Sequence, residues 1–216
     1  MTAEPGLIAQ TDQQLHALLA PLPLQVGQSS VAPGGAGLAV DVGEGDCRWT
    51  LVCEVRANGQ PRYLRAAALE ARERAQRLHA TGSIYPVVAA PFISAESGAI
   101  CQELGVGYAD LAGNCRLAFG TVYLERRVAK NPFPVRREQR SLFAPKSARV
   151  LRIMLGAPKR EWKVAELAAR AGISYGQVSK VRTSLLDREW ASGKWGGVRL
   201  AQPQALLDAW KQAYTP

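Results

Sequence analysis

The sequence predicts a chain of two domains, an α/β domain with a mixed β-sheet followed by a small and mostly helical domain. Over residues 1–125, helix-like and strand-like segments alternate in an order typical of a sheet covered by helices. Beyond residue 146 the pattern changes to short amphipathic helices. We therefore expect domains at residues 1–125 and 147–216, joined by a linker at residues 126–146.

The elements of the first domain follow from hydrophobic periodicity and from turn residues. The expected helices share an apolar stripe, and the expected strands are runs of β-branched and apolar residues bounded by glycine, asparagine or proline. In chain order we expect a helix at 11–19, strands at 38–42 and 47–56, a helix at 62–79, a strand at 85–90, a helix from Ser94 or Ser97 to about 104, and strands at 107–119 and 121–125.

The stretch 163–200 organises the second domain. Apolar residues at helical spacing predict a first helix that ends at Gly172, and Ser174 is a suitable N-cap for a second helix reaching about residue 188. Two helices joined by such a turn form a helix-turn-helix. The second helix then presents side chains that can hydrogen-bond bases or phosphates, together with its N-cap: Ser174, Tyr175, Gln177, Ser179, Lys180 and Arg182.

Residues 190–200 predict a hairpin directly after that second helix. Two short strands flank a glycine-rich tip that carries Lys194 and Trp195, and Arg199 lies just beyond it. A helix at 147–155 precedes the pair, and a last helix is expected at 204–214. We expect Trp162 and Trp190 to pack in the core of this domain.

Over residues 145–202 this pattern resembles winged helix-turn-helix DNA-binding domains, with the hairpin as the wing. The resemblance implies double-stranded DNA as the partner, no cofactor for DNA binding, and a homodimer. The second helix would enter a major groove. Lys180 and Arg182 would contact phosphate or guanine, and Gln177 would contact adenine.

The charge is divided unevenly along the chain. Residues 126–216 hold 19 Lys and Arg against 6 Asp and Glu, whereas residues 1–125 hold 8 against 12. A basic excess beside a helix-turn-helix is the electrostatic footprint of phosphate binding. The linker contributes Arg136, Arg137 and Arg140, which we expect to add affinity that does not depend on DNA sequence. Its Phe133, Leu142 and Phe143 predict that the linker docks on a folded surface.

Composition excludes several other classes. The sequence contains no long apolar run, so no membrane span or membrane partner is expected, and the N-terminus lacks signal-peptide features, which favours a cytoplasmic location. The four cysteines form no C-x-x-C pair, and their spacing suits neither a zinc site nor a disulfide framework.

Asp41, Glu54 and Arg56 form the one catalytic pattern of the first domain. They resemble the PD-(D/E)xK type of nuclease fold, also called restriction-endonuclease-like, in which two carboxylates hold a divalent cation. The resemblance implies that Asp41 and Glu54 bind Mg²⁺ if the site is active, with Asp46 as an alternative first carboxylate. Arg56 stands where the family has lysine. It can stabilise charge but cannot act as a general base.

A second resemblance is to bacterial regulators or antitoxins of the abortive-infection type. It is carried by residues 85–93 and 105–114, most clearly by the turn from Asp110 to Asn114, and it implies a toxin as a partner. The best-known members carry the winged helix first, whereas here it comes last. For Asp110 and Asn114 we expect turn chemistry, and a catalytic or metal role is the alternative.

Three functions remain open from the sequence. The first is a DNA-binding transcriptional regulator whose nuclease-like domain is inactive. The second is a metal-dependent endonuclease directed to its target by the winged helix. The third is a basic interaction module that binds an acidic protein.

Overall fold

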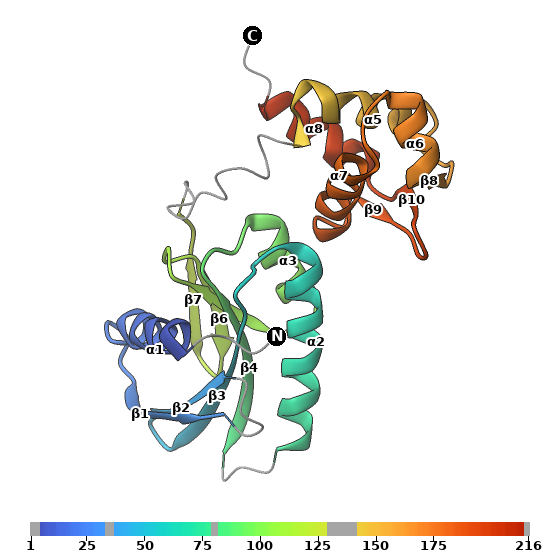
Figure 1. The fold of residues 1–216 in the computed structure, drawn as a ribbon. Helices are drawn as coiled ribbons and strands as arrows, with labels where there is room; N and C mark the ends of the chain where they lie inside the picture. The colour runs from blue at the N-terminus through green and yellow to red at the C-terminus, as the bar shows by residue number, and fades with distance from the viewer. Residues whose placement is uncertain (1–4, 33–36, 79–81, 129–141, 214–216) are drawn as a thin grey trace. The chain divides into compact units, whose positions relative to one another are not determined.

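The structure is a computed structural model that describes residues 5–32, 37–78, 82–128 and 142–213. The chain forms two compact units, Met1–Phe133 and Pro134–Pro216, and their boundary falls inside the predicted linker. The α/β class and the mixed sheet predicted for the first unit are confirmed (Figure 1).

The first unit is built on a seven-stranded sheet whose strands lie in chain order. The strands β1 to β3 are antiparallel, β3 to β5 are parallel, and β5 to β7 are antiparallel again. The elements are α1 (Pro5–Leu19), β1 (Gln25–Val31), β2 (Gly37–Glu44), β3 (Cys47–Val55), α2 (Pro61–Arg77), β4 (Ser83–Ala90), α3 (Ala95–Glu103), β5 (Gly107–Asp110), β6 (Cys115–Phe119) and β7 (Val122–Arg126).

Helices cover both faces of this sheet, with α1 on one side and α2 and α3 on the other (Figure 1). Alternation along β3 sends Leu51, Cys53 and Val55 into the core beneath α1. Glu54 therefore points to the α2 side. The buried face of α2 carries Leu64 and three alanines, and such small side chains let the helix lie close to the sheet.

Three features of the first unit differ from the expectation. The helix α1 begins at Pro5, six residues earlier than predicted. The strand β1 was not predicted, because its sequence QVGQSSV is polar and it lies at the edge of the sheet with most of its residues exposed. The stretch expected as one strand at 107–119 is two antiparallel strands, β5 and β6, separated by the predicted turn at residues 110–114.

The second unit combines four helices and a three-stranded antiparallel sheet among its described residues. The sheet order is β8-β10-β9, so the strand that precedes the helix pair joins the hairpin that follows it. The elements are α5 (Pro145–Gly156), β8 (Trp162–Lys163), α6 (Val164–Ala171), α7 (Tyr175–Asp187), β9 (Ala191–Ser192), β10 (Gly197–Leu200) and α8 (Pro203–Ala213).

One hydrophobic core holds the second unit together. It contains apolar residues from all of its helices, and Trp162 and Trp190 are buried in it as predicted. Leu142 is also buried there, and Phe143 stacks on Trp210 with ring centroids 6.0 Å apart. The end of the predicted linker is therefore anchored on this unit.

Candidate functional site

The helix pair of the second unit is set by two local signals that the sequence predicts. Gly172 caps α6 in the left-handed conformation with φ of 63°, which glycine adopts without steric cost. The hydroxyl of Ser174 accepts a hydrogen bond from the backbone N–H of Gln177 and so caps α7. The Ser174 side chain therefore has a structural task in addition to the binding role predicted for it.

The outer face of α7 carries most of the predicted contact residues. Tyr175 is 58% exposed, Lys180 is exposed, and Ser179 is half-buried on the same side. Gln177 is half-buried at the opposite margin of that face. Thr183 is exposed one turn beyond Ser179, and the sequence interpretation missed it although the i, i+4 spacing could have found it.

Arg182 lies on the side of α7 that faces the hairpin. Its Nε donates a hydrogen bond to the carbonyl oxygen of Gly197 at 3.0 Å, and the residue is half-buried. The contact fixes α7 against the start of β10. Arg182 is thus a positioning residue for the hairpin, a role that the sequence did not indicate, and its DNA contact stays a prediction.

The hairpin is formed as predicted, with β9 and β10 antiparallel and residues 193–196 at the tip. Lys194 and Arg199 are exposed, and Trp195 is fully exposed at 100%. The backbone N–H of Val164, at the start of α6, donates to the carbonyl oxygen of Gly196 at 3.3 Å. The tip is therefore tied to the first helix of the pair.

Gly176 occupies the second position of α7 with no structural need for glycine. A Cβ built there would meet nothing within 4 Å, and its φ is not positive. Glycine inside a helix costs about 0.5–1 kcal/mol relative to alanine. A glycine that packing does not require leaves the exposed face open for close approach by another molecule.

A second cationic group surrounds Trp162 and was not found from the sequence. The guanidinium carbons of Arg160 and Arg170 lie 4.0 and 5.1 Å from the centroid of the Trp162 ring, within cation–π range. Both arginines pair with the same oxygen of Glu166. Two guanidinium groups share one carboxylate, so the group keeps a net positive charge. The sequence spacing of these residues does not indicate the group, because only the fold brings Arg160 close to α6.

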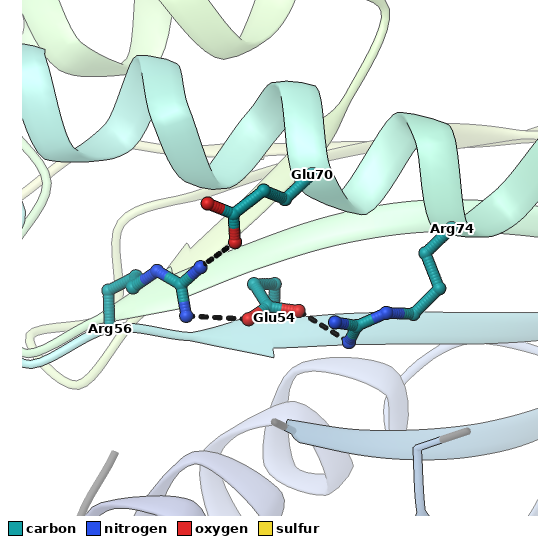
Figure 2. Close-up of polar contacts among 4 residues, drawn as sticks. All are labelled: Glu54, Arg56, Glu70 and Arg74. Carbon is teal, nitrogen blue, oxygen red and sulfur yellow. Dashed lines mark hydrogen bonds and ion pairs between the residues drawn. The ribbon is translucent and has the colours of Figure 1, made fainter. Parts of the chain in front are cut away.

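In the first unit, Glu54 lies between two arginines beneath α2 (Figure 2). Its Oε1 accepts from Nη1 of Arg56 at 2.6 Å, and its Oε2 accepts from Nη1 of Arg74 at 2.5 Å. Arg56 also pairs with Glu70 of α2. Glu54 is 1% exposed, and Arg56 and Arg74 are 18% and 21% exposed.

The electrostatics of this cluster are close to balance, with two carboxylates and two guanidinium groups. Burial raises the pKa of the Glu54 carboxyl above its ordinary value, while Arg56 and Arg74 act to lower it. Both oxygens of Glu54 are already engaged by cations. The sequence predicted Glu54 and Arg56 but missed Arg74 and Glu70, because nothing in the helical pattern of α2 indicates which charges meet the sheet.

Asp41 lies apart from Glu54, so the predicted metal pair is not brought together. Asp41 pairs with Thr50 in the β2–β3 register, whereas Glu54 pairs with Gly37. Four residues of strand separate the two positions by about 13 Å, too far for one small cation. The Thr50 hydroxyl donates to Asp41 at 2.7 Å.

The alternative carboxylate, Asp46, lies in the turn between β2 and β3, farther still from Glu54. Within the described parts of the chain, no three His, Cys, Asp or Glu side chains form a group that could hold a metal ion. The residues present therefore do not fit the Mg²⁺ that the nuclease resemblance implies.

Asp110 and Asn114 form a buried turn. The carboxylate of Asp110 accepts hydrogen bonds from the backbone N–H of Ile93 and from both the backbone and the side-chain amide of Asn114. The side-chain oxygen of Asn114 accepts from the backbone N–H of Val128. Burial raises the pKa of Asp110, and these donors act to lower it. The network confirms the predicted turn chemistry and ties three loops together.

Three predicted contact residues, Arg136, Arg137 and Arg140, lie outside the described residues.

None of the helices that the structure describes combines the length and apolar character needed to cross a membrane. Comparison of the chain with protein-family models, with curated proteins and with solved structures found no match.

Proposed function

We propose that the chain is a transcriptional regulator that binds double-stranded DNA through its second unit, and that its first unit has a nuclease-like fold that does not cleave DNA. One observation carries the proposal. The exposed face of α7 lies beside a hairpin that is braced to the same helix by Arg182, and both present cationic and hydrogen-bonding side chains.

The order of elements supports a winged helix-turn-helix. The helix pair α6–α7 follows one strand and precedes a two-stranded hairpin, and the three strands form one small sheet. In this arrangement α7 enters a major groove while the hairpin contacts the flanking backbone. Tyr175, Ser179, Lys180 and Thr183 would face the groove, and Lys194 and Arg199 would meet the DNA from the hairpin.

The charge of the second unit favours a polyanionic partner. Residues 142–213 carry 13 Lys and Arg against 5 Asp and Glu. Arg160 and Arg170, held on Trp162, add a cationic group whose two arginines are 45% and 53% exposed. Phosphates neutralised by such groups release counterions, which makes the binding depend strongly on salt.

The ion pairs of Glu54 support the proposal that the first unit does not cleave DNA. The element order of the first unit also supports a nuclease-like fold: a helix, three antiparallel strands, a second helix and a fourth strand parallel to the third. The carboxylate that would bind the metal is instead engaged by Arg56 and Arg74, and Asp41 lies four residues away along the sheet. A homodimer and a toxin partner stay predictions of the resemblances.

A matched pair of double variants tests the proposal. Lys180→Gln with Lys194→Gln removes two charges from the proposed interface, and Lys146→Gln with Lys211→Gln removes two exposed charges from α5 and α8. Binding to a short duplex is measured over a range of salt concentrations. The first double variant is expected to weaken binding and to reduce the salt slope by about two, because each lysine would neutralise one phosphate. The second is expected to change neither appreciably.

Two results would contradict the proposal. Equal losses from both double variants would mean that the binding reflects overall charge and no specific surface. Failure of the unaltered protein to bind duplex at low salt, together with binding to an acidic polypeptide, would favour the protein-interaction function.

A further inference from the structure

The tip of the hairpin carries an aromatic residue, Trp195, in a strained backbone conformation. The backbone N–H of Gly197 donates to the carbonyl oxygen of Lys194 at 2.9 Å, which closes a four-residue turn. Its central residues, Trp195 and Gly196, have φ of 51° and 81°. Turns with two positive φ values favour Asn, Asp and Gly, and a bulky residue there is strained.

The turn that carries Trp195 is firmly supported. Gly196 accepts a hydrogen bond from Val164 of α6, and Gly197 accepts one from Arg182 of α7. The hairpin backbones also pack closely, because a Cβ on Gly193 would lie 2.2 Å from the carbonyl oxygen of Gly197. The fold therefore holds the indole outward on a well-supported turn, although the strained backbone lowers local stability. Backbone strain of this kind is often found at functional sites.

An exposed indole flanked by cations matches the chemistry of nucleobases. Aromatic side chains stack on bases of any sequence, and apolar wedges that enter between base pairs unstack and bend a duplex. Lys194 and Arg199, both exposed, supply charge for the adjoining phosphates. We propose that Trp195 inserts into the duplex as a wedge, stacking on a base and opening one base step.

This inference rests on the proposed DNA binding, and its test separates the two. Binding is compared between a fully paired duplex and the same duplex with one central mismatch. Opening a mismatched step requires less free energy, so the unaltered protein is expected to prefer the mismatched duplex. Trp195→Asn is expected to abolish that preference. It suits the turn, because asparagine tolerates positive φ.

The loss of stacking has an expected size. The Trp195→Asn variant should bind the mismatched duplex about fivefold more weakly or worse, and Trp195→Phe should keep part of the affinity. A topological measurement gives a second readout. Closed circular plasmid relaxed by a topoisomerase in the presence of the protein should show a changed linking number, and at equal occupancy Trp195→Asn should not produce that change.

The outcomes distinguish the wedge from the DNA binding on which it rests. Duplex binding with the same mismatch ratio in both proteins and no unwinding would overturn the wedge and leave the proposed function in place. Absence of salt-dependent duplex binding would overturn both. Binding to phosphatidylserine vesicles that Trp195→Asn removes, with an unchanged mismatch ratio, would assign the tip to a lipid surface and overturn the wedge.

Discussion

Two arginine clusters, one in each unit, use their charge in opposite ways. In the first unit, Arg56 and Arg74 are mostly buried, and both are bound to Glu54, which is 1% exposed. In the second unit, Lys180, Lys194 and Arg199 are exposed, and Arg160 and Arg170 share one carboxylate on the surface of Trp162. The difference teaches that net charge locates a binding surface only after the cations used in internal ion pairs have been set aside.

Glu54→Gln removes the carboxylate that pairs with Arg56 and Arg74, and it should have the largest effect on stability. An amide cannot balance two guanidinium groups, so the variant is expected to lower the free energy of unfolding of the first unit by about 3 kcal/mol. Chemical denaturation of the full chain measures it. Glu73→Gln is the matched control, because Glu73 pairs with Arg77 on the exposed side of α2 and should change stability by less than about 0.5 kcal/mol.

A catalytic result would reverse the interpretation of Glu54. Supercoiled plasmid incubated with the protein and Mg²⁺ or Mn²⁺ is expected to stay intact. Nicking that depends on the metal, and that a folded Glu54→Gln variant loses, would make the first unit an endonuclease. The ion pairs around Glu54 would then have to open during catalysis.

Arg182→Lys tests an arginine of the second unit that, like Arg56 and Arg74, makes a contact inside its own unit. Lysine keeps the charge but lacks the Nε–H that reaches Gly197, so the variant should lower the free energy of unfolding of this unit by about 1 kcal/mol. Lys180→Arg, a change of the same type at an exposed position, should leave stability unaltered. Equal stability of the two variants would show that Arg182 does not brace the hairpin.

Gly176→Ala should have the smallest effect of these variants. It should raise the stability of the second unit and lower its affinity for duplex DNA. The added methyl group has open space and favours the helix, so the free energy of unfolding should rise by about 0.7 kcal/mol. Duplex affinity should fall if DNA approaches the helix closely. Gly156→Ala, at the end of α5, also has open space and should leave affinity unchanged. A gain in affinity at Gly176 would contradict close approach.

Local chemistry made much of the second unit predictable. The stop at Gly172 and the cap at Ser174 depend only on neighbouring residues, and the apolar spacing of α6 and α7 directly reflects burial against one core. The strand β1 escaped prediction for the opposite reason. Its QVGQSSV sequence has little preference of its own, and its pairing with β2 comes from the rest of the sheet.

The candidate sites were predictable only as residue types. The sequence indicates that Glu54 and Arg56 share a strand face. The contact of Arg74 with Glu54, however, depends on how α2 lies across the sheet. Asp41 was matched to Glu54 by a family pattern, and the β2–β3 register, which sequence reasoning could not fix, separates them. Arg182 likewise appears exposed on a helical projection until the hairpin folds back against it.

The pairing of β8 with β10 has a consequence for how the second unit folds. Trp162 lies opposite Val198, so this one pairing encloses α6 and α7 in a single closed loop. The free-energy cost of closing that loop is offset only when the contacts of the helix pair and of the hairpin are both in place. Neither part is then a separate folding unit: a chain cut before the hairpin would lose the strand partner of β8 and, with it, the cooperativity that holds the two helices at their turn.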